Sequence, residues 1–411
     1  MSLVFYILAV LLIYLSYKSL RGGFHYLNYF KKELARPPSD YTPFTTVFAP
    51  CKGLEDGLAK NLAALLEQDY PHYEVIFVTD GEHDPAVPVV REASRKAAMD
   101  AKLVFSSKAD ESSRKVESLR EAVLHADNRS QVFVFVDSDA RPSKDWLRNL
   151  VAPLEDVNVG AATGYRWLLS DRPTFASELR SVWNASIASA LGADTKSNFC
   201  WGGSMAIRRD TFERLDIREK WRGTLADDFA VTRAMNAAKL PIYFVPQALT
   251  ASIEDCTVRE MLEFTTRQMK ITRVYAPKLW LRSFLGSGLF CVVMLSAIAI
   301  VIFSRTNNLN VLIAIITLSL VSILGIGKSW LRLRAVRLVL TEYEDELRKQ
   351  MLPQLTLWLF SPFVFLYNSA AALFSRRIEW RGIQYELVSP TETKIIAVTA
   401  REEPMERRIR A

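Results

Sequence analysis

Apolar runs long enough to enter a bilayer lie near both ends of this 411-residue chain and enclose a mostly polar region from 41 to 280. The first run, Leu3–Tyr17, carries no charge and is followed by Lys18 and Arg21. A signal peptide would place basic residues before its apolar run and a small-residue cleavage site after it, and neither is present. Residues 1–22 are therefore expected to form an uncleaved transmembrane anchor whose carboxyl side faces the cytoplasm.

Residues 281–387 are expected to form a second membrane region. Phe284–Phe303 and Val311–Gly327 are joined by a short polar turn and followed by basic residues, which predicts a helical hairpin over 284–327 that crosses the membrane and returns. The chain is thus expected to be a multi-pass protein of the bacterial inner membrane, or of the Golgi or endoplasmic reticulum in a eukaryote, with residues 41–280 in the cytoplasm.

A further apolar stretch, Leu355–Phe374, is interrupted by Pro362 and followed by arginines. If it crossed the membrane completely, those arginines would lie on the side that the positive-inside rule disfavours. A broken, re-entrant or interfacial helix pair over 353–375 is therefore favoured, with a full crossing as the alternative. The charged residues 388–411 are expected to be a disordered tail.

Charge and cysteine content limit the class of partner. The net charge of +7 is modest, and the basic residues gather beside the membrane segments, so they indicate contact with a lipid bilayer. No nucleic-acid partner is expected, because the chain has neither a basic stripe with stacking aromatics nor a recognition motif. The four cysteines have no paired spacing, which argues against a disulfide framework or a zinc site and suits a reducing compartment.

Strand-like and helix-like runs alternate through residues 41–280 and predict an α/β fold. The expected strands are Thr45–Ala49, Tyr73–Thr79, Leu103–Ser106 and Gln131–Val136, and the expected helices are Leu58–Glu67, Ala86–Lys102 and Val116–Ala126. This order predicts a parallel, doubly wound sheet with helices on both faces. Ligands of such sheets bind at the carboxyl ends of the strands, so the residues that follow each strand are candidates for a site.

Asp137 and Asp139 follow the apolar run Val132–Val136, which is expected to be a strand buried on both faces. Two carboxylates at one strand end can direct oxygens at a hard cation, and Mg²⁺ or Mn²⁺ held in this way normally completes its shell with phosphates and water. The pattern predicts a metal site for a nucleoside diphosphate, with Asp139 as the main metal ligand and Asp137 contacting the metal or a ribose. The alternative is that Asp139 caps a helix that begins near Pro142.

Three acidic sites, at Asp80, Asp137–Asp139 and Asp227–Asp228, succeed one another along the chain. In this order they resemble the cytosolic domains of membrane-bound inverting glycosyltransferases of the GT-A type, which have a Rossmann-like, mostly parallel sheet. The nearer match is the ceramide glucosyltransferase family. A family strand that ends in Asp and is followed by Asp-Pro-Ala is matched by Val75–Ala86. The family motif Gly-x-Ser-x-x-x-Arg-x-Asp is matched by Gly202–Asp210, with the arginine offset by one place. The family motif Trp-Arg-Gly-x-x-Tyr is matched by Trp380–Tyr385. The resemblance covers most of the chain and rests on the order of the motifs, since any single one is weak.

The resemblance implies both an activity and a donor pocket. The implied reaction transfers a sugar, most readily glucose from UDP-glucose, to the hydroxyl of ceramide or a similar membrane lipid with inversion, which gives a β-linked glycolipid. Family residues that match Glu55 and Asp80 line the uridine pocket, and a lysine that matches Lys115 approaches the nucleotide. The alternatives without a function are that Asp80 is a turn aspartate before a glycine and that Lys115 is a solvated lysine on a helix. Gly202 and Gly203 would let backbone amides approach the donor sugar, or they form only a tight loop.

Asp227 and Asp228 follow Thr224–Ala226, which is interpreted as the end of another strand. Inversion needs a base that removes the proton of the acceptor hydroxyl, so Asp228 is the expected general base and Asp227 the neighbour that orients it. Adjacent residues of an extended backbone point to opposite faces, so only one of the two is expected to be essential. A helix cap before Phe229–Met235 is the alternative.

Thr257–Trp280 mixes apolar and basic residues in the pattern of a helix that lies on a bilayer surface. The family has a Gln/Arg-x-x-Arg-Trp motif here, near the diphosphate and the acceptor. Arg267 and Lys270 are therefore expected to bind the donor, with Lys270 in place of an arginine and Ile271 in place of a tryptophan. Lysine can neutralise phosphate as a point charge but cannot form the bidentate fork of arginine. The departure argues against processive polysaccharide synthesis.

Two other functions stay open at this point. The enzyme could use a different acceptor, such as a hopanoid or a diacylglycerol, or a different UDP-sugar. The chain could also be a non-catalytic membrane scaffold that retains the fold, for which the departure at Lys270 is the only support. The acidic residues kept at the strand ends count against a scaffold.

Overall fold

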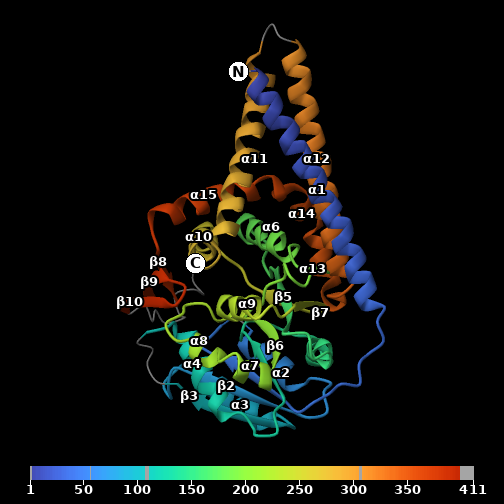
Figure 1. Ribbon diagram of the computed structural model, residues 1–411. Coiled ribbons are helices and arrows are strands. Elements are labelled where there is room, and N and C mark those ends of the chain that lie inside the picture. The colour runs from blue at the N-terminus through green and yellow to red at the C-terminus, as the bar shows by residue number, and fades with distance from the viewer. Residues whose placement is uncertain (1, 56, 107–110, 305–307, 399–411) are drawn as a thin grey trace.

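The computed structural model describes residues 2–55, 57–106, 111–304 and 308–398. Figure 1 shows an α/β domain below a bundle of three long helices, with further helices running across the base of the bundle. The α/β domain and the bundle are linked by chain segments at both ends, so the domain lies against one end of the membrane-type helices.

A seven-stranded sheet forms the centre of the α/β domain. Its strands are β1 (Thr45–Pro50), β2 (Tyr73–Thr79), β3 (Asp100–Phe105), β4 (Val132–Val136), β5 (Ala161–Leu169), β6 (Ser204–Arg208) and β7 (Ile242–Ile253). Their spatial order is β3-β2-β1-β4-β6-β5-β7, and β6 alone of these strands runs antiparallel to its neighbours. The prediction of an α/β fold with a mostly parallel sheet is confirmed.

Both faces of the sheet are covered by helices. Alternate residues of β1 show this, because Val47 and Ala49 join one apolar cluster and Phe48 joins another. The helices of the domain are α2 (Leu58–Leu66), α3 (Ala86–Lys96), α4 (Arg114–Ala122), α5 (Trp146–Val151), α6 (Phe175–Ala188), α7 (Arg209–Arg214), α8 (Ile217–Lys220) and α9 (Asp227–Ala237). Because helices cover both faces, a ligand can reach the sheet only at its edge, where the carboxyl ends of β1, β2 and β4 lie.

One predicted helix is wrong at its carboxyl end. The expected helix Ala86–Lys102 stops at Lys96, and β3 begins at Asp100 and pairs with β2 in parallel register. The alanine-rich stretch between them has helix propensity, but hydrogen bonding to an open sheet edge outweighs that weak preference.

Three helices among the described residues are long and apolar enough to cross a membrane. They lie within α1 (Ser2–Leu34), α11 (Pro277–Phe303) and α12 (Asn308–Arg337). The helix α1 extends well beyond the predicted anchor 1–22, and its carboxyl end packs on the sheet. There the Tyr29 hydroxyl donates to the Phe244 carbonyl (2.6 Å), and the Tyr243 hydroxyl donates to Glu33 Oε2 (2.7 Å).

Shorter helices lie at the base of the bundle (Figure 1). The helix α10 (Val258–Tyr275) leads into α11, and α13 (Glu344–Lys349) follows α12. The segment predicted as a broken pair consists of α14 (Met351–Thr356) with one 3₁₀ turn, and α15 (Ser361–Phe374), which meet at an angle of 54°.

A three-stranded antiparallel sheet follows α15 and corrects the expected disordered tail. Its strands are β8 (Arg377–Trp380), β9 (Ile383–Ser389) and β10 (Glu392–Val398). Alternate residues of β9, namely Ile383, Tyr385 and Leu387, are buried against Leu225 and Tyr275. This period of two is the signature of a half-buried strand. Residues 392–398 of the expected tail form β10, which pairs with β9 in antiparallel register. Residues 399–411 of the expected tail lie outside the described residues.

Candidate active site

A cavity of about 990 Å³ opens at the carboxyl ends of β1, β2 and β4. It is closed on its other sides by α9, α10 and the turn between β8 and β9. Most of the residues predicted for the site line it, namely Glu55, Asp80, Lys115, Asp137, Asp139, Asp227, Asp228 and Arg267. Four separate elements of the α/β domain thus bring their acidic residues to one place.

Lys115 holds the centre of the acidic group together. Its Nζ lies 2.7 Å from Asp137 Oδ1 and 3.2 Å from Asp227 Oδ1, and it donates to the Gly202 carbonyl at 3.4 Å. Burial disfavours its charge, but the two carboxylates outweigh this and raise the pKa of Lys115. Its position near the first turn of α4 is fixed by the Ser113 cap, whose hydroxyl accepts from the Val116 amide.

Gly202 and Gly203 lie beside this group and not on the cavity wall. A Cβ at Gly202 would collide with the Asp227 carboxylate, and a Cβ at Gly203 would collide with the Trp201 ring. Glycine is therefore required here because side chains of the acidic centre pack directly against the backbone.

Asp139 has one oxygen ready for a cation. Its Oδ2 lies 3.5 Å from Arg166 Nη1, whereas its Oδ1 is buried and has no hydrogen-bond partner among the described residues. Burial and the adjacent Asp137 charge raise the pKa of Asp139 to about 8. A buried carboxylate oxygen without a donor is costly unless a cation is bound, so this donor set fits a divalent ion.

The described residues contain no group of three or more His, Cys, Asp or Glu side chains arranged to hold a metal. Asp139 and Asp137 would thus provide at most two protein ligands. This number suits Mg²⁺ or Mn²⁺, which take one or two carboxylates and complete their shell with phosphate oxygens and water.

Asp80 and Glu55 also line the cavity, and Glu55 lies beside the loop that carries Asp137 and Asp139. Asp80 Oδ2 accepts from Arg114 Nη1 at 2.8 Å and lies 3.2 Å from Lys52 Nζ. Glu55 accepts from the Ser138 hydroxyl at 3.0 Å and forms an ion pair with Arg381. Both carboxylates are therefore oriented by neighbours, although each keeps lone pairs for the hydroxyl or amide groups of a ligand.

Asp227 and Asp228 begin the helix α9, so the strand interpretation of Thr224–Ala226 is wrong. These three residues form an extended loop without a strand partner. On a helix, successive side chains are about 100° apart and not opposite, so both aspartates reach the cavity. The argument that only one of them could point inward fails for this reason.

Asp228 has the surroundings of a general base. Its Oδ2 accepts from the Gly202 amide (3.3 Å) and its Oδ1 from the Phe229 amide (2.7 Å). Burial and the neighbouring Asp227 charge raise its pKa to about 7. A base whose pKa is near neutral can both accept a proton during the reaction and release it afterwards.

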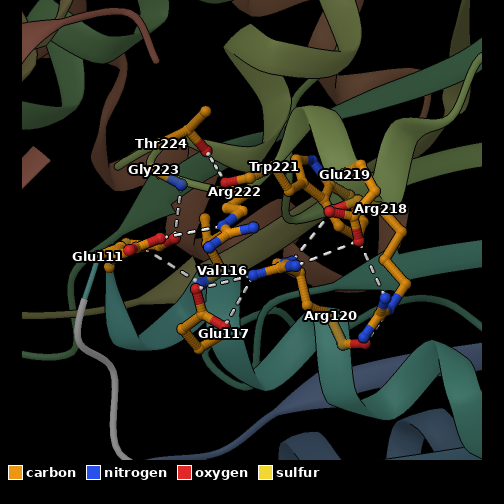
Figure 2. Close-up of polar contacts among 12 residues, drawn as sticks. Glu111, Val116, Glu117, Arg120, Arg218, Glu219, Trp221, Arg222, Gly223 and Thr224 are labelled. Carbon is orange, nitrogen blue, oxygen red and sulfur yellow. Dashed lines mark hydrogen bonds and ion pairs between the residues drawn. The ribbon is translucent and has the colours of Figure 1, made fainter. Parts of the chain in front are cut away.

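Figure 2 shows the contacts that bind α4, the helix of Lys115, to the segment before the two aspartates. Arg120 lies 3.3 Å from Glu219, and its Nε donates to the Arg218 carbonyl (3.1 Å). The Arg218 Nε donates in return to the Arg120 carbonyl (3.0 Å). This reciprocal pair couples α4 to α8, which directly precedes the loop.

The loop itself is held from both sides. The Ser113 hydroxyl donates to the Leu225 carbonyl (2.7 Å), and the Leu225 amide donates to the Tyr275 hydroxyl (2.8 Å). Gly223 has a φ of 75° and packs directly against the Thr391 carbonyl of the carboxyl-terminal sheet, where a Cβ would collide. The spacing between the two aspartates and Lys115 is therefore set by three separate parts of the chain.

Lys270 is the one predicted donor-binding side chain that points elsewhere. Its Nζ donates to the Arg377 carbonyl at 2.7 Å, and it does not line the cavity. Ile271 is buried in the cluster that supports β9. The helix α10 directs Lys270 toward the carboxyl-terminal sheet, whereas Arg267, one turn earlier, and Ile271 both line the cavity.

Five arginines that line the cavity were not assigned from the sequence, namely Arg114, Arg166, Arg180, Arg233 and Arg381. Arg166 lies on β5, and Arg381 lies in the turn between β8 and β9. Arg381 belongs to the Trp-Arg-Gly element that carried part of the resemblance, and this motif is the only signal that pointed to it. Arg166 lies within an otherwise apolar strand, and this isolated charge was the sequence signal that could have indicated a functional role for it.

The cavity continues toward the membrane helices. Its wall there includes Leu279 and Ser283 of α11, Phe365 of α15, and Trp183 and Ile187 of α6. These side chains are mostly apolar, in contrast to the carboxylates at the other end. One cavity therefore joins the acidic centre to the base of the helical bundle.

A family model described as glycosyl transferase family 21 matches residues 4–393. A ceramide glucosyltransferase of Komagataella phaffii (strain GS115 / ATCC 20864) is 26% identical over 95 residues, which are 23% of this chain and 18% of that enzyme. The match thus spans less than a fifth of the length of that curated relative.

Two solved structures resemble the fold at low identity. The mannosyltransferase PcManGT from Pyrobaculum calidifontis, solved with GDP-Man and Mn²⁺, is 21% identical with a TM-score of 0.44, covering 88% of this chain and 99% of that chain. GalNAc-T7, solved with UDP, GalNAc and Mn²⁺, is 13% identical with a TM-score of 0.41, covering 54% of this chain and 45% of that chain.

Proposed function

The chain belongs to glycosyl transferase family 21, and from this premise we propose that it transfers glucose from UDP-glucose to the hydroxyl of ceramide or a ceramide-like membrane lipid. The observation that carries the proposal is the single cavity that runs from the acidic centre to the base of the membrane-type helices. A nucleotide sugar fits its charged end, and a lipid fits its apolar end. The sugar carbon would lie between them.

The chain's own residues supply the acceptor chemistry. Asp228 accepts the proton of the lipid hydroxyl as its oxygen attacks the anomeric carbon, and the nucleoside diphosphate departs from the opposite face. This single displacement inverts the configuration and gives a β-linked product from an α-linked donor. Asp227 is held by Lys115 and maintains, by its negative charge, the raised pKa of Asp228.

The donor is held by other residues of the same cavity. Asp80 and Glu55 are placed to accept hydrogen bonds from the ribose or the uracil, and Arg267 faces the cavity as a cation for the diphosphate. Asp139, with Asp137, would hold Mg²⁺ or Mn²⁺, and a bound ion would offset the negative charge of the diphosphate.

Incubation of purified protein in lipid nanodiscs with radiolabelled UDP-glucose tests the proposal. Ceramide, diacylglycerol and a hopanoid are offered separately, and UDP-galactose and UDP-N-acetylglucosamine replace UDP-glucose in parallel. The expected product is a hexosylceramide with a β anomeric proton by NMR. Transfer to another lipid only, or from another sugar only, would correct the substrate, and no transfer to any lipid would refute the proposed function.

The proposed reaction predicts a cytoplasmic α/β domain. Basic residues lie in the last turns of α1 and α12, at the end of the bundle that meets this domain, and positive charge is retained on the cytoplasmic side. In sealed vesicles with the cytoplasmic face outward, added protease should therefore cut within residues 41–280. Protection of this region in such vesicles, with cleavage only after detergent is added, would reverse the topology.

The raised pKa of Asp228 predicts an acidic limit to activity. A general base works only when deprotonated, so kcat/KM should fall about tenfold per pH unit below a pH near 7 and level off above it. Because the Asp227 charge helps to raise this pKa, Asp227→Asn should move the acidic fall in kcat/KM to lower pH. If the fall in kcat/KM stays at the same pH in this variant, the titrating group is not Asp228.

A further inference from the structure

Three arginines from distant parts of the chain meet in the cavity. Arg166 comes from β5, Arg267 from α10 and Arg381 from the turn between β8 and β9. The guanidinium groups of Arg166 and Arg267 lie 5.3 Å and 5.5 Å from the centre of the Phe264 ring, and Arg267 lies 5.7 Å from the Trp380 ring. Aromatic rings therefore hold these cations in place without neutralising them.

The positive charge of this group is only partly neutralised. Arg166 Nη1 lies 3.5 Å from Asp139, but its Nε is buried without a hydrogen-bond partner among the described residues. Arg267 contacts two rings and forms no ion pair within the described part of the chain. Burial, followed by the charges of Arg166 and Arg381, lowers the pKa of Arg267 to about 10, so the guanidinium stays protonated at neutral pH.

The backbone at Arg381 is unusual for its residue type. Trp380 pairs with Ile383, so Arg381 and Gly382 form a two-residue turn, and both have positive φ, 49° and 72°. Such turns favour glycine, asparagine or aspartate, because a larger side chain is strained in the left-handed region. An arginine kept there at a cost in stability indicates a role for its side chain. It points toward Glu55, is 37% exposed and faces the open cavity.

We propose that Arg166, Arg267 and Arg381 together form the binding site for the two phosphates of a nucleoside diphosphate, an assignment that rests on the proposed function. In this arrangement Arg381 takes the place that was predicted for Lys270 as a second cation beside Arg267. Lys270 cannot fill it, because its side chain is hydrogen-bonded outside the cavity. A guanidinium also offers two parallel N–H donors to a phosphate, which an ammonium group does not.

The group fits the electron flow of the transfer. The bond from the anomeric carbon to the β-phosphate oxygen breaks, and its electron pair stays on that oxygen. The lipid oxygen forms the new bond to the carbon, and its proton goes to Asp228. The three guanidinium groups keep their protons and stabilise the charge that develops on the departing diphosphate.

The test compares UDP with uridine, which has the same base and ribose but no phosphate. Arg381→Gln and Arg267→Gln are measured in full-length protein in nanodiscs, by calorimetry for UDP and by ligand-observed NMR for uridine. Arg377→Gln is the matched control, because Arg377 lies on the same strand as Trp380 with its side chain 68% exposed. Arg381→Lys keeps the positive charge but removes the two parallel N–H donors of the guanidinium group.

Each cavity variant should weaken UDP binding by about tenfold or more, since a hydrogen bond to a charged group is lost. Uridine binding should change less than about twofold in Arg267→Gln, and in Arg381→Gln, which also releases Glu55, it should fall less than UDP binding does. Arg381→Lys should lie between Arg381→Gln and the wild type, and Arg377→Gln should match the wild type. Equal losses for UDP and uridine would show that Arg381 only orders Glu55 and would overturn the proposal, as would unchanged UDP binding. A wild-type protein that binds neither ligand would overturn the proposed function itself.

Discussion

Replacing Asp228 with asparagine should lower turnover by about 10²- to 10⁴-fold while leaving the affinity for UDP nearly unchanged, because general-base catalysis contributes a factor of this size. Asparagine has almost the same shape, and its single carbonyl oxygen can keep one of the two bonds from the Gly202 and Phe229 amides. It cannot accept the proton of the lipid hydroxyl. The fold should persist, since the substitution removes a buried charge at a site where burial disfavours that charge.

Steady-state kinetics with a lipid acceptor and calorimetry with UDP would measure the two effects separately. Asp171→Asn provides the control, because Asp171 is exposed and does not line the cavity. If the variant keeps its turnover but loses nucleotide binding, Asp228 binds the donor and is not the base for the acceptor. An α-linked product from the wild-type protein would exclude the single displacement altogether.

Replacing Asp139 with asparagine should remove metal-stimulated turnover, with a loss of about 10²-fold or more, since a metal ion supplies several kcal/mol of charge stabilisation. The neutral amide is a much weaker ligand for a hard cation than the carboxylate whose Oδ1 is unpartnered in the described structure. The substitution is close to isosteric, so the ion pair with Arg166 is lost without a change of volume.

Mn²⁺ binding followed by electron paramagnetic resonance would test the ligand role independently of catalysis. Asp139→Asn should weaken Mn²⁺ binding in the presence of UDP, and Asp145→Asn, an exposed aspartate six positions along the chain, should not. Full activity of the wild-type protein in an excess of chelator would contradict a metal requirement and leave Asp139 as a partner of Arg166 only.

Local sequence patterns were sufficient to predict the strands that position Asp80, Asp137 and Asp139. Each strand is a continuous apolar run, and a strand buried on both faces leaves a polar residue at its end, so the position of each carboxylate follows from a few neighbouring residues. The α/β class follows for the same reason, because it depends on the order of elements and not on their detailed packing.

The errors arose where long-range packing decides the outcome. Thr224–Ala226 is short, bends at Leu225 and has no pairing partner, and none of this is visible in its three residues. The direction of Lys270 depends on which face α10 presents to the carboxyl-terminal sheet, whose strands were not predicted from the sequence. Arg381 pairs with Glu55 across 326 positions of sequence, a separation over which no local pattern carries information.

The attachment of α1 to β7 bears on how the acceptor reaches the site. Tyr29 and the Glu33–Tyr243 pair bond the end of the first long helix to an edge strand of the sheet, so the helix and the cavity move as one body. With that helix in a bilayer, the apolar mouth of the cavity is kept at a constant depth and tilt. The lipid acceptor of the proposed reaction would then arrive by lateral diffusion within one leaflet, and the rate would depend on its mole fraction in that leaflet. Dilution of the vesicles at fixed lipid composition would leave the acceptor saturation unchanged.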